Sequence, residues 1–494
     1  MNINSQKKAT SAWQQGQLVE ITITDLTDSG DGVGRYGQKV VFVPDTVPGD
    51  RLLARLTLVK PKYAYGKLHQ LLETSNHRIK PHCIVADKCG GCQWQHINYE
   101  YQLQAKQNQV IQALERIGGL TKPLISPILA SQPPFGYRNK ATYPLATSTT
   151  GQVKAGYYQK GSHKLINLNQ CPIQDQRLNP LLKEVKQDIT KQGWQIYDEY
   201  KHTGIVRHFS LRIGNNTGEM LLTLVINGDQ EEPQKLLPGI EAQAEEWLQR
   251  YPQLVGVCLN YNPKATNTIF GQQTVCVAGR LYLREKFRGL KFQLTPDTFF
   301  QVNTRAAEKL IEIVIRELAL SGSEVIVDAY CGVGTFTLPL AKYLQQVSKG
   351  HNDSMETVGE DLSQMRSAKS MTIGLELQQV AIDRAWLNAE INHLTNVSFY
   401  VGKVEDLLPQ LQVKPDIVLL DPPRKGCDRS VLESLLQLLP DRIVYISCKP
   451  ATLARDLNIL CSSGKYCLSK VQPADFFPQT AHVECAAFLM RSEV

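Results

Sequence analysis

Apolar and polar residues alternate with a period near two in the first part of the chain. Between residues 16 and 72 this alternation runs through the short segments "QLVEITITDL", "KVVFVPDTV" and "DRLLARLTLVK", which the turn-rich "TDSGDGVGRYGQ" and "VPGD" separate. A period of two with intervening turns is typical of short β-strands. Five or so strands within about 60 residues predict a small barrel, an architecture that often binds oligonucleotides.

A second region with a period near two follows a single helical segment. The segment "NYEYQLQAKQNQVIQALERIGG" has helical spacing and ends in a Gly-Gly stop. Residues 128–298 then alternate strands with loops, in segments such as "YRNKATYPLAT", "VRHFSLRIG" and "EMLLTLVIN". This spacing predicts a β-rich central domain.

From about residue 300 onward, buried strands alternate with amphipathic helices. The helical segments "TRAAEKLIEIVIREL", "TFTLPLAKYLQ" and "LQQVAIDRAWLNAEI" are interleaved with the apolar runs "EVIVDAY", "MTIGLE", "DIVLLD" and "RIVYISC". The alternation predicts a doubly wound α/β sheet, whose ligands bind at the carboxyl ends of the strands. The polar stretch 346–370 lacks periodicity and predicts an exposed, partly disordered insertion.

Composition adds few constraints to this picture. The 494 residues carry a formal net charge of +7, from 54 Lys and Arg against 47 Asp and Glu, which permits an anionic partner such as RNA without requiring one. We expect no membrane span and no signal segment, because no apolar run is long enough. The twelve cysteines are therefore expected in a reducing cytoplasm, where clustered cysteines indicate metal binding or catalysis before disulfides.

The segment "KPKYAYGKLH" places cations beside aromatic residues in the predicted barrel. Lys60, Lys62 and Lys67 are interleaved with Tyr63 and Tyr65. Cations that meet phosphates, beside aromatic rings on which bases stack, suit single-stranded nucleic acid. A solvated edge strand is an equally good interpretation of these residues.

The first chemical motif lies where a strand of the α/β region ends. In "DAYCGVGT", residues 328–335, a strand ends at Asp328, and a turn with Gly332 and Gly334 leads into a helix. Such glycines let the backbone approach a ligand at a helix N-terminus. The next strand ends in Glu376, a candidate acceptor for ribose hydroxyls, although a helix-capping role is the alternative. Glu376 follows Gly332 by 44 positions, against roughly 20 in a dinucleotide fold, and the polar insertion accounts for most of the excess.

Two further strand ends carry reactive residues. Asp421 begins "DPPR", a rigid loop, and Arg424 stands where methyltransferases acting on exocyclic amines typically have an aromatic residue. Cys448 follows the strand "RIVYIS". Buried packing is the more common role of a lone cysteine, but the ends of neighbouring strands converge on one crevice. We therefore interpret Cys448 as a nucleophile whose thiolate Lys449 favours.

Four other cysteines suggest a metal site. Cys83, Cys89 and Cys92 form a C-x5-C-x2-C pattern, and Cys171 precedes a proline in "NQCPI". Cys-Pro is common in iron–sulfur ligand motifs, while a structural zinc fits four cysteines equally well on spacing alone. Unligated thiols are the remaining interpretation. The spacing differs from the C-x3-C-x2-C of radical enzymes, which favours a structural or RNA-positioning role.

Taken together, these motifs resemble the RNA uracil-5-methyltransferase family. The segments "FFQVN", "DAYCGVGT", "LDPPRKG", "YISCKP" and "HVECAAFL" occur in family order, and with the cysteine set they resemble the TRAM-domain, iron–sulfur branch that acts on 23S ribosomal RNA. The resemblance implies three parts. These are an OB-like TRAM barrel at 10–72, a β-rich RNA-binding part at 73–94 and 128–298, and a Rossmann-like catalytic part at 95–127 and 299–494.

The resemblance also implies roles for individual residues. Four residues would bind S-adenosyl-L-methionine: Gln301, Tyr330, Glu376 and Asp421. Cys448 would be the nucleophile and Glu484 the base, while the four cysteines would hold a [4Fe–4S] cluster. Thr335 and Lys403 differ from the asparagines usual at two cofactor-side positions, which leaves the contacts there open. Without the resemblance, Glu484 is also readable as a surface carboxylate.

The implied chemistry is covalent catalysis on a pyrimidine. Uracil C5 is too weakly nucleophilic to take a methyl group unaided, and thiolate addition at C6 makes C5 electron-rich. A base must then remove the C5 proton so that the thiol can leave. Two alternatives stay open: a tRNA T-loop uracil-5-methyltransferase, and a non-catalytic RNA-binding or ribosome assembly factor. We expect a monomer.

Overall fold

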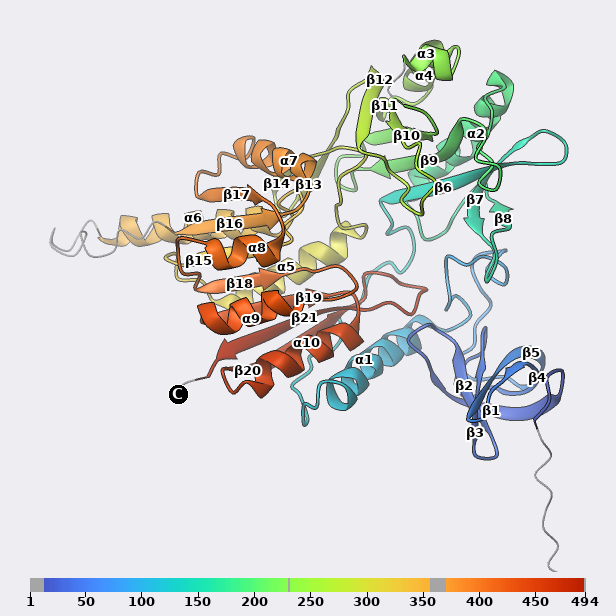
Figure 1. Ribbon diagram of the computed structural model, residues 1–494, viewed down its shortest axis with the longest axis horizontal. Helices are drawn as coiled ribbons and strands as arrows, with labels where there is room; N and C mark the ends of the chain where they lie inside the picture. The colour runs from blue at the N-terminus through green and yellow to red at the C-terminus, as the bar shows by residue number, and fades with distance from the viewer. Residues whose placement is uncertain (1–12, 230–231, 356–369, 493–494) are drawn as a thin grey trace, which may run out of the picture. The chain divides into compact units, whose positions relative to one another are not determined.

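The computed structural model describes residues 13–229, 232–355 and 370–492, with the backbone alone at 349–355. Contacts group the chain into two units (Figure 1). Unit 1 comprises Met1–Ala105 with Gln479–Ala481, and unit 2 comprises Lys106–Pro478 with His482–Val494. Among the described helices, none combines the length and the apolar character that crossing a bilayer requires.

Unit 1 contains the small barrel that the sequence predicts. Its five strands close in the order β1-β2-β3-β5-β4, with β3 and β5 parallel. In β1 every second side chain from Val19 to Ile23 is buried, which is the period-two pattern of a strand with one face in a core. The strands are β1 (Leu18–Leu26), β2 (Gly32–Tyr36), β3 (Lys39–Val43), β4 (Arg51–Val59) and β5 (Tyr63–Glu73).

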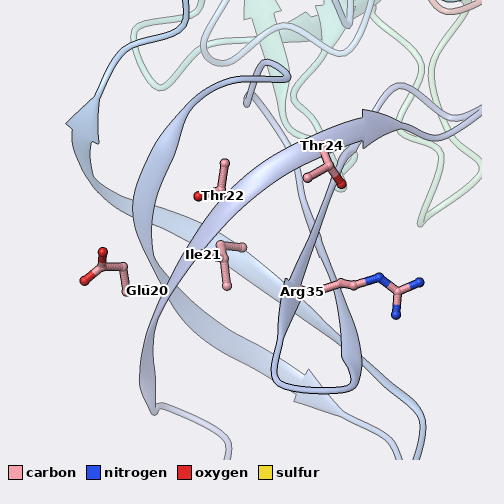
Figure 2. Close-up of a pocket in the computed structure, with 5 residues that line it drawn as sticks. All are labelled: Glu20, Ile21, Thr22, Thr24 and Arg35. Carbon is pink, nitrogen blue, oxygen red and sulfur yellow. The ribbon is translucent and has the colours of Figure 1, made fainter.

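A shallow hollow lies on the outside of this barrel (Figure 2). It measures about 380 Å³ and is lined from β1 and β2 by Glu20, Ile21, Thr22, Thr24 and Arg35. None of the residues that the sequence assigns to chemistry lines the hollow, so we give it no part in the reaction.

A short segment from near the C-terminus completes unit 1. Gln102 Nε2 donates to Gln479 Oε1 at 3.1 Å, and the Gln479 N–H donates back to Gln102 Oε1 at 2.9 Å. The Gln479 carbonyl also accepts the N–H groups of Gln93 and Trp94, at 3.1 and 3.0 Å. Ala481 joins the apolar cluster around the buried Trp94 ring. Residues 479–481 are thereby fixed to the segment that follows the three clustered cysteines.

The central part of unit 2 is built on a seven-stranded sheet. Its order is β12-β11-β10-β9-β6-β7-β8, and only β10 and β11 run parallel within it. A β13–β14 hairpin follows. The strands are β6 (Lys140–Thr147), β7 (Val153–Tyr158), β8 (Leu165–Asn167), β9 (Val206–Ile213), β10 (Met220–Ile226), β11 (Leu254–Tyr261), β12 (Gln273–Gly279), β13 (Leu283–Phe287) and β14 (Leu290–Leu294).

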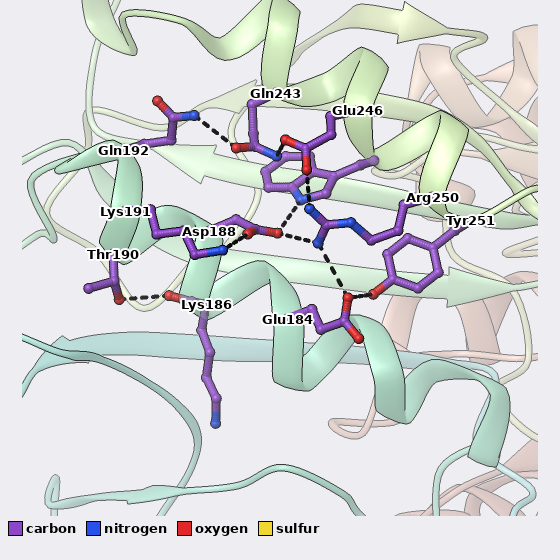
Figure 3. Close-up of polar contacts among 11 residues, drawn as sticks. Glu184, Lys186, Asp188, Thr190, Lys191, Gln192, Gln243, Glu246, Arg250 and Tyr251 are labelled. Atoms are coloured by element: carbon purple, nitrogen blue, oxygen red, sulfur yellow. Dashed lines mark hydrogen bonds and ion pairs between the residues drawn. The ribbon is translucent and has the colours of Figure 1, made fainter.

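The period near two predicts strands and loops here, whereas the structure also contains helices in this part. These are η1 (Gln176–Leu178), α2 (Asn179–Gln192), α3 (Pro233–Leu236) and α4 (Ile240–Arg250). Helices α2 and α4 contact the sheet and are joined by buried polar groups (Figure 3). Asp188 on α2 accepts hydrogen bonds from Trp247 Nε1 at 2.9 Å and Arg250 Nη1 at 2.7 Å, both on α4. Pairing with Arg250 stabilises the buried carboxylate, which would otherwise be costly.

The C-terminal part of unit 2 is the doubly wound sheet that the sequence predicts. Its order is β17-β16-β15-β18-β19-β21-β20, where only β20 and β21 are antiparallel to their neighbours. The strands are β15 (Val325–Ala329), β16 (Met371–Glu376), β17 (Val397–Val401), β18 (Ile417–Leu420), β19 (Arg442–Ser447), β20 (Tyr466–Ala474) and β21 (Glu484–Arg491).

Helices connect these strands and cover the sheet (Figure 1). They are α5 (Thr304–Leu318), α6 (Thr337–Met355), α7 (Gln379–Glu390), α8 (Val404–Leu407), η3 (Leu408–Gln410), α9 (Arg429–Leu438) and α10 (Pro450–Ser462). The helix α1 (Tyr99–Arg116) ends before the predicted Gly-Gly stop. The predicted irregular insertion at 346–370 is in part wrong, because α6 continues through its first ten residues to Met355. Residues 356–369 lie outside the described part of the chain.

Candidate functional site

The strand order of the doubly wound sheet determines where its ligand site lies. From β15 the sequence proceeds outward through β16 to β17 on one side and through β18 to β19 on the other. The two adjacent strands β15 and β18 therefore form the switch point, and ligands of such sheets bind outside the carboxyl ends of these strands. Three of the strand-end residues noted in the sequence, Tyr330, Asp421 and Cys448, directly follow β15, β18 and β19.

The glycine-rich turn after β15 is held by Glu376. The Gly332 N–H donates to Glu376 Oε2 at 3.2 Å, and the Gln378 N–H donates to Oε1 at 2.9 Å. Tyr330 opens the turn with a φ of 70°, a left-handed conformation that few side chains adopt. Glu376 thus holds the turn after β15 and the residue that directly precedes α7.

Buried carboxyl groups gather at this edge of the sheet. Burial raises the pKa of Asp421 from 3.8 to about 7, although the residue itself is only partly buried, with part of its surface exposed. Burial, with smaller effects from Asp421 and Glu376, also raises the pKa of Asp328 to about 7. Thr337 Oγ1 donates to Asp328 Oδ2 at 2.5 Å, whereas Oδ1 has no hydrogen-bond partner among the described residues. Gln301 Nε2 donates to Asp421 Oδ2 at 3.5 Å.

This group of carboxyls fits a cationic ligand. Burial disfavours the ionised form of a carboxyl, which is why the pKa values of Asp328 and Asp421 are high, and the charges of Asp421 and Glu376 add to the rise at Asp328. A positive charge bound among them would favour their ionised forms. The unpartnered oxygen of Asp328 is a further acceptor in a place where buried acceptors are normally satisfied.

The final strand brings Glu484 to Cys448. Strand β21 runs antiparallel to β19, with Cys485 opposite Ser447. Because of this register, the first residue of β21, Glu484, lies beside the residue that follows β19, Cys448. The two groups interact: burial raises the pKa of Cys448 to about 11, and the Glu484 charge contributes to that rise. Burial, followed by Asp421, raises the pKa of Glu484 to about 8.

Arg424 is the cation that acts on this pair. Its charge opposes the pKa rises of both Cys448 and Glu484. Arg424 Nη2 also lies 3.4 Å from His482 Nε2, two residues before Glu484. From the sequence, Lys449 is expected to favour the thiolate; among the charges with the largest effect on the pKa of Cys448, the one that lowers it is Arg424. The sequence marks Arg424 only as a departure from an aromatic residue, because its electrostatic effect on Cys448 depends on the fold.

Helix α10 braces the two loops that carry Arg424 and Cys448. Thr452 Oγ1 donates to the carbonyl of Lys449 at 3.0 Å and lies 3.4 Å from the carbonyl of Arg424. A Cβ on Gly426, whose φ is 80°, would lie 2.6 Å from Asp456 Oδ2, so the loop requires glycine at this point. The N-terminus of α10 follows Cys448 directly, and helix N-termini favour nearby negative charge, including a thiolate.

The four predicted cluster ligands do not all belong to the same unit of the structure. Cys83, Cys89 and Cys92 belong to one segment of unit 1, while Cys171 belongs to unit 2. The N–H of Gly91 donates to Cys89 Sγ at 3.4 Å. Within the described ranges, no three or more His, Cys, Asp or Glu side chains gather as a metal site. The predicted iron–sulfur cluster is therefore supported by the sequence alone.

The structure also shows the surroundings of the two positions that depart from the asparagines usual in the family. Thr335 is buried in the turn that leads into α6, and Lys403 is exposed directly before α8. Asp328 was noticed only as a strand end, and its high pKa and unpartnered oxygen become visible only in the fold.

Comparisons with known proteins agree with this architecture. The profile of the tRNA (uracil-5-)-methyltransferase family matches residues 98–492, and the profile of the TRAM domain matches residues 12–69. An uncharacterized RNA methyltransferase of Nostoc sp. is 60% identical over 483 residues, which cover 98% of each chain. Another from Synechocystis sp. is 54% identical over 477 residues, covering 97% of this chain and 96% of the relative.

A solved structure extends the likeness to almost the whole fold. It is the Pyrococcus abyssi tRNA (uracil-54, C5)-methyltransferase in complex with S-adenosyl-L-homocysteine. The likeness has a TM-score of 0.71 at 26% sequence identity and covers 95% of this chain and 99% of the archaeal one.

Proposed function

The chain belongs to the tRNA (uracil-5-)-methyltransferase family, and from this premise we propose that it methylates C5 of a uridine in RNA through a covalent Cys448 intermediate. The observation that carries the proposal is that Glu484 and Cys448 directly adjoin the paired residues Cys485 and Ser447 of β21 and β19, at the edge where the cofactor site of a doubly wound sheet lies. A nucleophile and a base side by side are what this addition and elimination require.

The methyl donor in this proposal is S-adenosyl-L-methionine, held by Gln301, Tyr330, Glu376 and Asp421. The cofactor supplies an electrophilic methyl group on a sulfonium. It carries positive charge, which suits a crevice where burial has raised the pKa values of Asp328 and Asp421. Tyr330 opens the turn after β15, and Glu376, the last residue of β16, accepts a hydrogen bond from that turn, in the place where a nucleoside is bound in this fold.

In the proposed reaction, each of the chain's own groups has a separate role. The Cys448 sulfur adds to C6 of uracil, which makes C5 an enolate carbon able to take the methyl group. Arg424 favours the thiolate, because its charge opposes the rise in the pKa of Cys448. After the transfer, the Glu484 carboxylate removes the C5 proton, the C6–S bond breaks and Cys448 leaves as the thiolate. A pKa near 8 suits Glu484 to this task, since a base works best near the ambient pH.

The first experiment tests the nucleophile. RNA that contains 5-fluorouridine should form an adduct stable to denaturation, because fluorine at C5 cannot be removed as a proton. Cys448→Ala should abolish the adduct, while Cys461→Ala, which changes another partly buried cysteine in α10, should preserve it. An adduct that persists in Cys448→Ala would refute the assignment. Absence of any methylation by the wild-type protein would favour the non-catalytic RNA-binding alternative.

The second experiment separates the base from the nucleophile. Glu484→Gln should still add to ordinary uridine and methylate it once, but it should stall with the RNA bound through Cys448. Denaturing gels should then show more complex than for the wild type, with a mass that includes the methyl group. A variant that turns over normally, or that is inactive without trapped complex, would show that Glu484 is not the eliminating base.

For the substrate we propose 23S ribosomal RNA, on the resemblance carried by the TRAM barrel and the cysteine set. The second candidate is a tRNA T-loop uridine, which the likeness to the archaeal tRNA (uracil-54, C5)-methyltransferase favours. That enzyme is matched over nearly its whole length, so the barrel by itself does not distinguish the two substrates. Transcripts of 23S rRNA and tRNA, methylated in parallel and mapped for 5-methyluridine, should show activity on the ribosomal RNA alone.

We also propose a [4Fe–4S] cluster on Cys83, Cys89, Cys92 and Cys171, in a monomer of the reducing cytoplasm. The support is the C-x5-C-x2-C spacing and the Cys-Pro pair. Protein purified without oxygen should be brown and contain about four irons per chain. Colourless protein with stoichiometric zinc would refute the cluster without affecting the methylation proposal.

A further inference from the structure

Two cysteines of the central sheet lie directly opposite each other. In the antiparallel pair β11–β12, Val257 is opposite Ala278, but the next register pair is Cys258 with Cys276. The ladder therefore contains a bulge in which Val277 is the extra residue. Without it, Cys258 would oppose Val277, and Cys276 would face the other side of the sheet, because side chains alternate along a strand. The bulge is what brings the two thiols together.

The spacing of the two strands suits a disulfide. Directly opposed residues of an antiparallel pair have Cα atoms about 4.5–5.5 Å apart, which falls inside the roughly 4.4–6.8 Å range of disulfides. The two thiols already interact through a hydrogen bond between their side chains. Cys258 is fully buried, whereas Cys276 is exposed on the edge strand of the sheet. One thiol is thus accessible to solvent, and the other is buried beside it.

The hydrogen bond also polarises the pair. It lowers the pKa of Cys276 to about 7, against the opposing effect of partial burial, and it raises the pKa of Cys258. The nearby Asp297 raises the pKa of Cys258 further. The exposed member is consequently the better thiolate at neutral pH, and the buried member keeps its proton.

We propose that Cys258 and Cys276 form a redox-active pair, which hydrogen peroxide converts into a cross-strand disulfide. The Cys276 thiolate attacks one peroxide oxygen, the O–O bond breaks, and the departing hydroxide takes up a proton to give water and a Cys276 sulfenic acid. The Cys258 sulfur then attacks the Cys276 sulfur, the S–O bond breaks, and the oxygen leaves as a second water with the Cys258 proton. Peroxide is reduced by two electrons, and the two thiols are oxidised by the same two.

The modification lies outside the proposed methyl-transfer site and does not depend on it. It would tie the edge strand β12 covalently to β11. The chain provides a matched control in Cys467, which is also exposed and also on an edge strand, β20, but lies opposite Met490. Cys467 is likewise exposed and has no thiol across its strand pair.

Limited peroxide treatment of the full-length protein, followed by alkylation and peptide mapping, tests the inference. We expect a Cys258–Cys276 linked peptide about 2 Da lighter than the two reduced peptides together, with alkylation lost at both positions and restored by dithiothreitol. Cys467 should remain alkylated. In Cys258→Ser, the sulfenic acid on Cys276 should persist and react with dimedone, whereas the wild type should show little of this adduct.

The wild-type peptide map needs no substitution, so a folding defect of a variant cannot decide the matter. Failure to recover the linked peptide while Cys467 is oxidised would overturn the inference. So would dimedone labelling of Cys276 that is equal in the wild type and in a folded Cys258→Ser protein, because Cys258 would then not be the resolving thiol.

Discussion

The buried carboxyl of Glu484 should make the free protein less stable as the pH rises, and Glu484→Gln should remove this dependence. Its pKa is 4.5 in the unfolded chain and about 8 in the folded one. Between these values the folded state binds more protons than the unfolded state, so stability falls with increasing pH. The loss is absent below pH 4.5 and complete above about pH 8.

The size of the effect follows from the shift. The difference of about 3.5 pKa units, from 8 minus 4.5, corresponds to about 5 kcal/mol at 1.36 kcal/mol per unit. This value is an upper limit, because relaxation and water penetration around a buried ion reduce the penalty. Glutamine resembles the protonated acid in shape and charge. The variant should therefore match the wild type near pH 5 and become progressively more stable than it toward pH 8.5.

Urea unfolding at about pH 5, 7 and 8.5 measures the difference in free energy. The control is Glu433→Gln on the exposed surface of α9, which should show no such trend. A Glu484→Gln protein that is less stable at every pH, or whose advantage is the same at all three, would refute the buried environment of this carboxyl. The same variant should be unable to release RNA, so stability and turnover should change in opposite directions.

Three more outcomes are expected. Arg424→Gln should shift formation of the 5-fluorouridine adduct to higher pH, because the charge that opposes the raised pKa of Cys448 is lost, and Arg424→Lys should restore it in part; an unchanged pH profile would argue against this role. Binding of S-adenosyl-L-methionine near pH 7 should release protons, seen as a buffer-dependent enthalpy, and Asp421→Asn should reduce the release. Tyr63→Ala and Tyr65→Ala should each weaken RNA binding by about 1–3 kcal/mol, while phenylalanine at the same positions should not, since stacking needs only the ring.

Sequence periodicity was sufficient to predict the parts of the fold in which the regularly spaced apolar residues of each strand or helix face the core. The barrel alternates clearly, and each of the runs ending at Ala329, Glu376, Leu420 and Ser447 is a strand of the doubly wound sheet. The central part was predicted less completely. There α2 and α4 lie within a region rich in strands, and their stability depends on groups far apart in the chain, such as Asp188 and Trp247.

Pairing across the sheet could not be predicted, and it decides the candidate site. From the sequence, Cys448 could be placed at a strand end by its position after an apolar run. Glu484 became a candidate only through the family resemblance, because nothing local shows that its strand runs antiparallel beside β19. The bulge that aligns Cys258 with Cys276 is invisible for the same reason, since one extra residue reverses the side of the sheet that a side chain faces.

The burial of carboxyl groups explains both the loss of stability expected at high pH and the proposed chemistry of this edge of the sheet. Asp328, Asp421 and Glu484 are buried together, and in the free protein each has a pKa at or above about 7. A bound cation would favour ionisation of the first two. An ionised Asp421 would in turn keep the pKa of Glu484 high, because Asp421 already raises it. The ionisation of Asp421 and the basicity of Glu484 are therefore linked.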